Sequence, residues 1–410
     1  VLRTSSGTVL ASSQDINYLA SIKNQFRSQE VRDKAGRYEN GTWNVWNYGI
    51  GATAANGAGK YRVGGLLDLD GTNYDQHHRD RLGSSAADAT EYSISFKNLF
   101  PEMFPVSFPV YALEDSLQLF LEFAEQGVTG DVAVSSTGTA TDVGSVLIDL
   151  NKLRFISDHI FMDQPVMDKL YAMTKTSQGL QIPYADYNLV KMNRIAPTAP
   201  QANLKTTLRF QNSIGMSGLR IKHILIHNSE ADANGHPTST QSIAGKYACA
   251  DSYSGEGGQS VQLQIDNSNY YNQDLVNSHF YRELEDCFGV AMSCPYPAYT
   301  TIGAVTDGTL GDGNVKYTLA DRAMIMSDTV FSVAQDKLVG SSNVIGINFT
   351  SPLNRPNNGT NGKLIGSAPV QLTYQRDFTA TQNDNLLTRV FICASRVMVI
   401  QNGVIVNNYS

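Results

Sequence analysis

The spacing of apolar residues along the chain predicts strands more often than helices. Within residues 116–124, Leu117, Leu119, Leu121 and Phe123 take every second position, which is the period of a strand with one buried face. The same alternation, in a less regular form, runs through residues 261–265, 344–349, 370–374 and 388–400, and a further strand-like run covers residues 180–192. These segments predict a fold built mainly from strands.

Helical spacing is confined to three segments. Residues 13–33 place Ile16, Leu19 and Phe26 near one face, with basic residues elsewhere, and Ser13 or Asp15 can cap the start. We expect this segment to be an amphipathic helical arm that precedes the strands and belongs to no sheet. Short helices are predicted at residues 164–173 and 278–288, where acidic and apolar residues recur at helical spacing.

The length of the chain sets its domain organisation. At 410 residues it exceeds the ~250–300 residues at which one hydrophobic core stops growing. The best boundary is the polar, glycine-containing gap at residues 174–181. We therefore expect an N-terminal arm at residues 1–36, one body at residues 37–178 and a second at residues 179–410. Glycine- and serine-rich stretches at residues 231–259 and 294–316 predict long surface loops.

Composition agrees with strands joined by turns. Charged residues make up 17% of the chain, while there are 34 Gly and 31 Asn, residues that serve turns and disfavour helix interiors. The net charge of −7 lacks the basic footprint of a nucleic-acid-binding protein, so we expect no specific nucleic acid partner. No apolar run reaches the ~18 residues of a membrane-spanning helix, and residues 1–8 lack a secretory pattern. A targeting segment could have preceded Val1.

The cysteines and glycosylation sequons carry little chemistry. Cys249, Cys287, Cys294 and Cys393 form no CxxC pair and are too sparse for a disulfide framework, so we expect four reduced thiols. His279 lies eight residues from Cys287, but that cysteine sits among apolar residues, and buried thiols are usually inert. Sequons at Asn40, Asn348, Asn358 and Asn408 are expected by chance in a chain so rich in Asn.

One motif resembles a catalytic one. Asp68 and Asp70, in the sequence Leu-Asp-Leu-Asp-Gly-Thr, match the nucleophile motif of haloacid-dehalogenase-type phosphatases, and Asp312 with Asp321 could complete a Mg²⁺ site. That chemistry needs an apolar parallel strand before the first Asp and alternating helices and strands after it. Two Gly residues precede Asp68, and no such alternation follows. We expect an ordinary turn here, because Asp and Gly serve tight turns.

Other site patterns fail on spacing. The run from residue 49 to Lys60 ends in Gly-Lys, but a phosphate-binding loop needs Gly where Ala54 stands and Ser or Thr where Tyr61 stands. Asp75, His77, His78 and Asp80 lie close in sequence without the spacing of a closed metal site. No Gly-x-Ser-x-Gly elbow occurs. We therefore expect no catalytic, cofactor-binding or metal-binding residues, and no enzyme.

Segments of the first half resemble a viral family. Residues 94–100 (Ile-Ser-Phe-Lys-Asn-Leu-Phe), residues 108–113 (Phe-Pro-Val-Tyr-Ala-Leu) and the strand at residues 117–123 are similar to an approach strand, a corner and a following strand in the double jelly-roll major capsid proteins of double-stranded DNA viruses. Residues 153–163 resemble that family's strand before a short helix. They depart from the pattern at Gln164-Pro165, where an acidic residue and Arg are usual.

Segments of the second half resemble the same family in order. Residues 208–210 and 221–226 resemble its strand pair, although the usual Pro is missing and residues 215–218 fill the space. Residues 261–267, followed by Tyr270 and Tyr271, resemble a strand ending in a turn. The segments at 345–349, 369–372 and 397–403 follow its closing order, which ends in a β-ribbon. The resemblance spans residues 90–410. The family that it points to includes the major capsid proteins of iridoviruses, phycodnaviruses, polinton-like viruses and virophages.

The resemblance implies an all-β fold of two eight-stranded jelly rolls side by side. It also implies a structural role in the virion: a homotrimeric, pseudo-hexagonal capsomer that tiles an icosahedral shell. The implied partners are neighbouring capsomers, penton proteins and minor or cement proteins. The arm at residues 1–36 then has two open placements. It can lie beneath the capsomer, where Ile16, Leu19 and Phe26 meet an internal membrane or a minor protein, or it can pack on its own barrel or a trimer neighbour.

Two functions from other classes stay open. Jelly rolls also serve as lectins, so an all-β carbohydrate-binding or glycan-processing protein is one alternative. Trp43 and Trp46 are the only tryptophans, which makes a poor aromatic platform for sugars. The phosphatase that uses Asp68 and Asp70 is the other alternative, and hydrolysis of p-nitrophenyl phosphate with Mg²⁺ would reveal it.

Overall fold

Antiparallel strands dominate the part of the chain that the structure describes. The structure is a computed structural model that describes residues 1–25, 45–46, 62–63, 66–67, 94–100, 108–122, 153–157, 160–198, 201, 204–231, 252–253, 259–276, 283–284, 286–288, 339–340, 344–350, 362–379 and 385–409. Every strand pairing within these residues is antiparallel. The mostly-β fold predicted from the sequence is confirmed.

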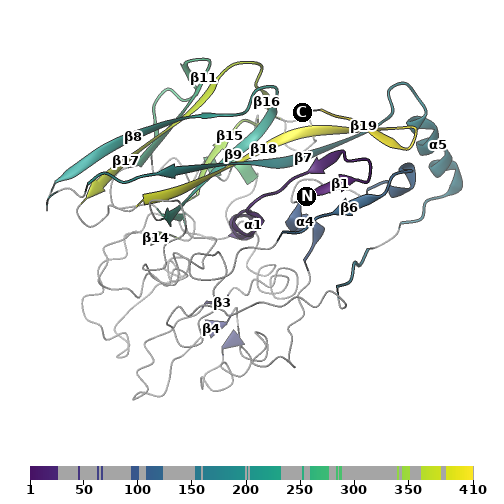
Figure 1. The fold of residues 1–410 in the computed structure, drawn as a ribbon, viewed down its shortest axis with the longest axis horizontal. Helices are drawn as coiled ribbons and strands as arrows, with labels where there is room; N and C mark the ends of the chain where they lie inside the picture. Colours follow the sequence, from purple (N-terminus) through teal and green to yellow (C-terminus); the bar gives the residue numbers. More distant parts are fainter. Residues whose placement is uncertain are drawn as a thin grey trace.

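Two facing sheets form the main body (Figure 1). The first, which we call the β18 sheet, contains β7 (Leu180–Arg194), β9 (Arg220–Ala231), β15 (Ile345–Asn348) and β18 (Asn385–Gln401). The second, the β17 sheet, contains β8 (Lys205–Ile214), β11 (Gln259–Ile265), β13 (Leu275–Val276) and β17 (Val370–Thr379). β18 lies between β7 and β9, and β17 lies between β8 and β11.

The pairing of these eight strands is nested. The first strand, β7, pairs with the last, β18; the second, β8, pairs with β17; β9 pairs with β15, and β11 pairs with β13. Each sheet receives four of the eight strands. Two four-stranded sheets with this nested pairing have the connectivity of a jelly roll.

The remaining described strands are short. β12 (Ser268–Asn269) extends β11, β16 (Lys363–Leu364) extends the edge of β9, and β19 (Val404–Tyr409) pairs with the end of β18. β10 (Ser252–Tyr253) pairs with β14 (Val339–Gly340), while β3 (Val45–Trp46), β4 (Arg62–Val63) and β5 (Leu66–Leu67) form a small sheet. A further sheet, of three strands, joins β1 (Leu2–Thr4), β2 (Val9–Ala11) and β6 (Leu117–Leu119).

Two hairpins are closed by residues with positive φ. Asp266 (φ 53°) and Asn267 (φ 60°) join β11 to β12, and Asn402 (φ 49°) and Gly403 (φ 80°) join β18 to β19. Positive φ at both central residues is typical of type I′ turns, which match the twist of the flanking strands and favour Asn and Gly. The turn and the closing β-ribbon expected from the sequence are both present.

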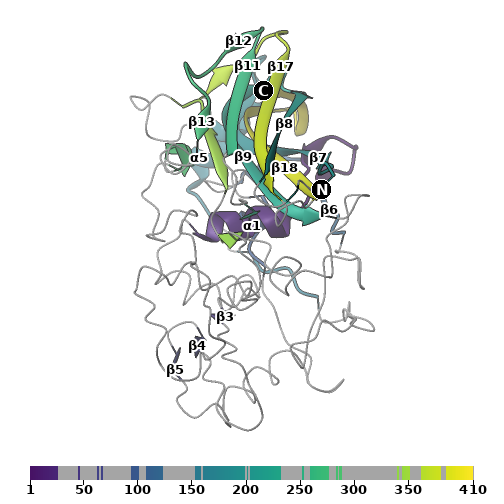
Figure 2. The same cartoon turned by 90° about the vertical axis from the view of Figure 1, so that its left-hand side faces the viewer.

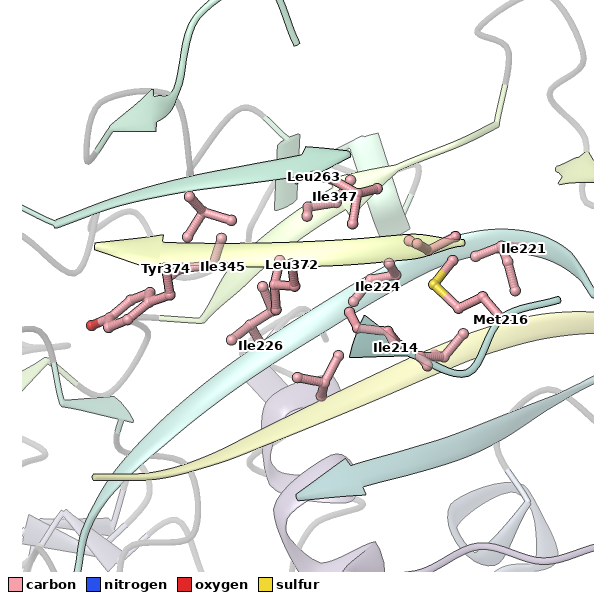
Figure 3. Packing of buried hydrophobic residues seen from close by; sticks show 14 of the residues in the cluster. Ile214, Met216, Ile221, Ile224, Ile226, Leu263, Ile345, Ile347, Leu372 and Tyr374 are labelled. Atoms are coloured by element: carbon pink, nitrogen blue, oxygen red, sulfur yellow. The ribbon is translucent and has the colours of Figure 1, made fainter. Parts of the chain in front are cut away.

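The main core fills the space between the two sheets (Figure 3). Ile224 and Ile226 of β9 face Leu372 and Tyr374 of β17, and Ile345 and Ile347 complete the layer; all six side chains are fully buried. The strands predicted at residues 261–265, 344–349, 370–374 and 388–400 all contribute to these sheets, and the run at residues 180–192 is β7.

The β18 sheet is buried on both of its faces. Phe391 and Ile392 are adjacent in β18, yet both are fully buried: Ile392 belongs to the core between the sheets, and Phe391 belongs to a second cluster on the opposite face. Helix α1 (Ile16–Gln25) covers that second face with Tyr18, Leu19 and Ile22. In Figures 1 and 2, α1 lies on the side of the β18 sheet away from β17. Burial on both faces explains the irregular alternation of residues 388–400.

Helix α1 takes one of the two placements left open for the N-terminal arm, because it packs on its own barrel, and it is not a separate element. The helix itself is present as α1, but Leu19 and Ile22 have no exposed surface and pack with residues of β7, β9 and β18. The described part of the segment is therefore a core element, which follows from the rule that an amphipathic helix covers apolar protein surface where it finds some. Phe26 and the rest of residues 26–36 lie outside the described residues.

A third apolar cluster joins the first half to the second. Leu2 and Leu10, together with Phe100 and Ala112, pack on Tyr184, Met398 and Ile400 of the β18 sheet. The short elements here are α4 (Phe96–Leu99), the 3-10 turn η1 (Val110–Ala112) and β6. The backbone N–H of Glu114 also donates to the carbonyl of Gly403, 2.8 Å away.

Several predicted elements have different conformations. The approach strand expected at residues 94–100 contains helix α4, and of the strand expected at residues 116–124, the described residues 116–122 form only the three residues of β6. No strand occurs in the described part of residues 153–163, whose side chains are exposed. Consecutive strands β8 and β9, expected as a pair, lie in opposite sheets. The predicted helix at residues 164–173 is α5 (Gln164–Thr174), and residues 283–284 and 286–288 are helical within the segment 278–288.

Candidate functional site

Most of the residues with catalytic potential lie outside the described part of the chain. This holds for Asp68, Asp70, Asp312 and Asp321, for residues 49–60, for Asp75, His77, His78 and Asp80, and for Trp43 and His279. Among the residues that are described, no group of three His, Cys, Asp or Glu side chains could hold a metal ion. Within the same residues, no helix is long and apolar enough to cross a membrane.

Two of the four cysteines are described, and both are free. Cys393 is buried in β18, and Cys287 packs against the same cluster beneath α1. Burial raises the pKa of the Cys287 thiol well above its usual range, and the nearby Glu283 carboxylate acts in the same direction. Cys249 and Cys294 lie outside the described residues.

We expect Cys287 and Cys393 to resist alkylation in the folded chain. The thiolate is the reactive form of cysteine. Burial disfavours loss of the thiol proton and keeps the reagent away from the sulfur. Brief iodoacetamide treatment at pH 7.5, followed by mass spectrometry of peptides, should leave both residues unmodified, while the same treatment in denaturant should modify both. Rapid modification of Cys287 under native conditions would contradict its placement.

The side chain of one sequon residue, Asn348, bonds within the turn that follows its strand. The side-chain amide of Asn348 donates to the carbonyl of Thr350 at 3.3 Å, and its oxygen accepts from the Thr350 hydroxyl at 2.7 Å. Asn348 is half-buried and its strand, β15, belongs to the β18 sheet. Its amide therefore serves the end of the strand. Asn40 and Asn358 lie outside the described residues.

Exposed apolar side chains gather on the first half. Among the described residues, 22 large apolar side chains are exposed, and thirteen of them fall between residues 110 and 173. Six form a nearly continuous segment, which we call the apolar belt: Leu153, Phe155, Ile156, Ile160, Phe161 and Met162. Their exposed fractions run from 40% to 94%. The Phe155 ring contacts the Phe96 ring of α4, with centroids 5.5 Å apart.

The apolar belt is large for a surface that faces water. Side chains of this size offer roughly 150 Å² each, so six of them at these exposures present roughly 600 Å² of apolar surface. That equals the upper end of the largest patch on a typical monomer, roughly 300–600 Å². Val166, Tyr171 and Met173 of α5, which follows directly, are also exposed. Exposed apolar surface of this size is typical of regions that contact other protein surfaces.

Polar groups lie beneath α1, and no local pattern in the sequence marks them. The Asp15 carboxylate, just before the helix, accepts from Arg389 Nε at 2.7 Å and from Lys191 Nζ at 2.8 Å. Burial alone would raise the pKa of Asp15, but these two hydrogen bonds outweigh it and hold that pKa below its usual value. The Arg389 guanidinium also lies 3.7 Å from the centre of the Tyr18 ring. These contacts fasten the start of α1 to the β18 sheet.

A second buried guanidinium lies at one end of the sandwich core. Arg194, at the end of β7, is 2% exposed, and its Cζ lies 4.1 Å from the centre of the Tyr374 ring. Burial lowers the pKa of Arg194 to about 10, so the group stays charged at neutral pH. Phe210 flanks it at 5.4 Å. The aromatic rings replace part of the hydration that the cation loses.

Comparisons with known proteins give matches among solved structures alone. No protein-family model matches the sequence, and no curated protein matches it. PBCV-1 VP54, fitted into a reconstruction of the virophage Sputnik, is 11% identical; the match covers 60% of this chain and 54% of that chain, with a TM-score of 0.33. The mavirus major capsid protein is 9% identical, with 56% of this chain and 41% of that chain covered and a TM-score of 0.30.

A further match is the PBCV-1 virus capsid, at 10% identity and a TM-score of 0.32; it covers 60% of this chain and 55% of that one. The chain thus spans about half the length of the first solved proteins that it matches. Two of these three matched structures are a virus capsid and a major capsid protein.

Proposed function

We propose that this chain is a double jelly-roll major capsid protein, a structural subunit of the icosahedral shell of a double-stranded DNA virus. The observation that carries the proposal is the nested pairing of β7 to β18. The family-like segments of the second half fall on β8, β9, β11, β15, β17 and the β18–β19 hairpin, in the order that the family has them. Apolar alternation alone does not produce that order, because it says nothing about which strand pairs with which.

The apolar belt supports a second jelly roll in residues 37–178. It lies within this range, near its C-terminal end, and comes directly before α5, which ends close to the start of β7 at Leu180. A sheet of the first jelly roll would bury the belt and remove roughly 600 Å² of apolar surface from water, at about 25 cal/mol per Å². The proposed domains are residues 37–178 and residues 179–410.

The proposed assembly follows from how such bodies associate. Three chains would form a pseudo-hexagonal homotrimer through heterologous interfaces, in which a surface of one copy meets a different surface of the next. Permanent interfaces of this kind commonly bury about 2,000 Å² or more. Neighbouring capsomers, penton proteins and minor or cement proteins are the further partners we propose. The function is structural and not enzymatic, and its place is the virion.

The mass of the purified chain in solution tests this proposal. We expect light scattering at micromolar concentration and moderate salt to give three times the chain mass of 44.7 kDa, and electron microscopy to show particles with pseudo-hexagonal outlines. The mass should persist on tenfold dilution, because a permanent interface does not dissociate in this range. A strictly monomeric mass would contradict the capsomer.

Two assays separate the alternatives from the proposal. Binding on a glycan array would favour a carbohydrate-binding protein. Mg²⁺-dependent hydrolysis of p-nitrophenyl phosphate that disappears in Asp68→Asn or Asp70→Asn would favour the phosphatase. A trimer that shows neither activity fits a shell protein.

A further inference from the structure

Three positively charged or protonatable residues form one row across the face of the β18 sheet that α1 covers. Lys191 of β7 lies opposite Arg389 of β18, and Arg389 lies opposite His227 of β9, in the same register position. Directly opposite residues in an antiparallel pair have Cβ atoms roughly 5 Å apart, and like charges there repel. The neutral form of His227 therefore suits this row, and the protonated form does not.

Helix α1 seals Arg389 and His227 from water, while Lys191 at the end of the row stays exposed. The Tyr18 ring lies against both neighbours: its centroid is 3.7 Å from Arg389 Cζ and 5.4 Å from the centroid of the His227 ring. His227 has no exposed surface, and Arg389 is 2% exposed. Since a buried charge lacks the hydration that it has in water, a second cation beside Arg389 would be strongly unfavourable while α1 is docked.

A second histidine lies farther along the same face. The Tyr187 hydroxyl is 2.8 Å from His223 Nε2, and Lys23 Nζ of α1 lies 5.3 Å from the centre of the Tyr187 ring. His223 is 4% exposed and contacts Phe288, with centroids 5.8 Å apart. A proton on His223 would also add positive charge close to a lysine of α1.

Among the described residues at the contact between α1 and the β18 sheet, positive and negative charges are unequal in number. The described elements packed around this contact contribute the following titratable or charged residues: Asp15, Tyr18 and Lys23 from α1 and its start; Tyr187 and Lys191 from β7; Arg389 and Cys393 from β18; His223 and His227 from β9; and Asp286 and Cys287 from the helical residues 286–288. Glu283, which is also helical, is bonded to the Tyr271 hydroxyl at 2.8 Å. Asp15 is the carboxylate that binds Arg389 and Lys191.

We propose that α1 is docked by an acid-sensitive latch, in which protonation of His227, reinforced by His223, weakens the docking of the helix on the β18 sheet and raises the population of a locally opened state. Histidine in water takes up a proton near pH ~6.5. A histidine that must stay neutral in the docked state gives stability that is present above that pH and is lost as the pH falls below it. Release would expose the apolar face around Leu225 and Phe391. This inference does not depend on the capsid function.

Hydrogen exchange of the full chain tests the latch. Protection of the α1 amides at residues 16–25, corrected for intrinsic exchange, should fall about tenfold between pH 7.5 and pH 5.5, the change expected where one proton unit separates docked from released states. The amides of β17, on the other sheet, should keep their protection. Protection of α1 that does not change with pH would overturn the proposal.

Matched variants assign the effect to the row. His227→Gln, which cannot be protonated, should reduce the pH-dependent loss to less than about twofold, while His77→Gln should keep the full loss of the parent. Should His227→Gln fail to fold, Asp15→Asn gives the second measurement: it should lower α1 protection at pH 7.5 and leave the further loss at pH 5.5 in place. Full pH dependence in a folded His227→Gln would show that another group is the sensor and would overturn the assignment.

Discussion

Deletion of residues 1–25 is expected to abolish the cooperative thermal unfolding transition of the chain. The deletion removes Leu2, Leu10, Tyr18, Leu19 and Ile22, all of them buried, together with strands β1 and β2 and helix α1. Truncating one buried side chain of this size typically costs about 2–5 kcal/mol, so the loss of five exceeds the roughly 5–15 kcal/mol that stabilises a typical domain.

Calorimetry and near-ultraviolet circular dichroism of the deleted chain measure this result directly. A double variant in the same segment, Val9→Ala with Gln14→Ala, serves as the control, because both residues are exposed and the variant should keep the parent transition within a few degrees. A deleted chain that unfolds cooperatively near the parent temperature would show that the segment is a separate arm after all, as the sequence alone led us to expect.

The second large effect concerns neighbouring residues of one strand. We expect Phe391→Ala and Ile392→Ala each to lower the free energy of unfolding by about 3–4 kcal/mol, because each side chain is fully buried on its own face of the β18 sheet. In a strand with one face in water, one of the two would cost little. Urea denaturation of both variants, with the slope of the transition checked for two-state behaviour, gives the two values.

Strand β11 offers the matched comparison. Leu263 is fully buried between the sheets, while its neighbour Gln264 lies on the polar face and bonds to Asn269. Leu263→Ala should therefore cost several kcal/mol, and Gln264→Ala less than about 1 kcal/mol. Equal costs at Leu263 and Gln264, or a small cost at Phe391, would contradict the distinction between the two sheets.

Local patterns predicted much of the second half. Alternating apolar residues located β11, β15 and β17, because the alternation of the two faces along a strand is visible in the strand's own sequence. No information about distant residues is needed to find it. The helix at residues 164–173 followed from the same kind of local pattern. Asn402 and Gly403 marked a hairpin because a two-residue turn with positive φ tolerates few other residues.

The failures have a shared physical cause. The apolar stripe of α1 shows that the helix needs a cover, but not which surface supplies it, since Asp15 and Arg389 are 374 positions apart in sequence. The row of Lys191, Arg389 and His227 could not be seen either, because its members meet only through strand register. The apolar residues of segment 94–100 have spacings that fit either a strand or a helix. In the structure the segment contains a helix, and apolar side chains of the segment pack in the cluster that contains Phe100 and Tyr184.

The partners of β18 also determine the order in which the chain can fold during synthesis. Its 17 residues pair with β7 along one edge and with β9 and then β19 along the other, so the centre of the sheet is a strand that is made long after β7 and β9. Until the ribosome releases it, β7 and β9 have no strand between them, and the apolar residues of both remain uncovered. Strands that wait for such a distant partner fold slowly and are prone to aggregate. Nascent chains of this protein should therefore be strong clients for chaperones that bind exposed apolar segments.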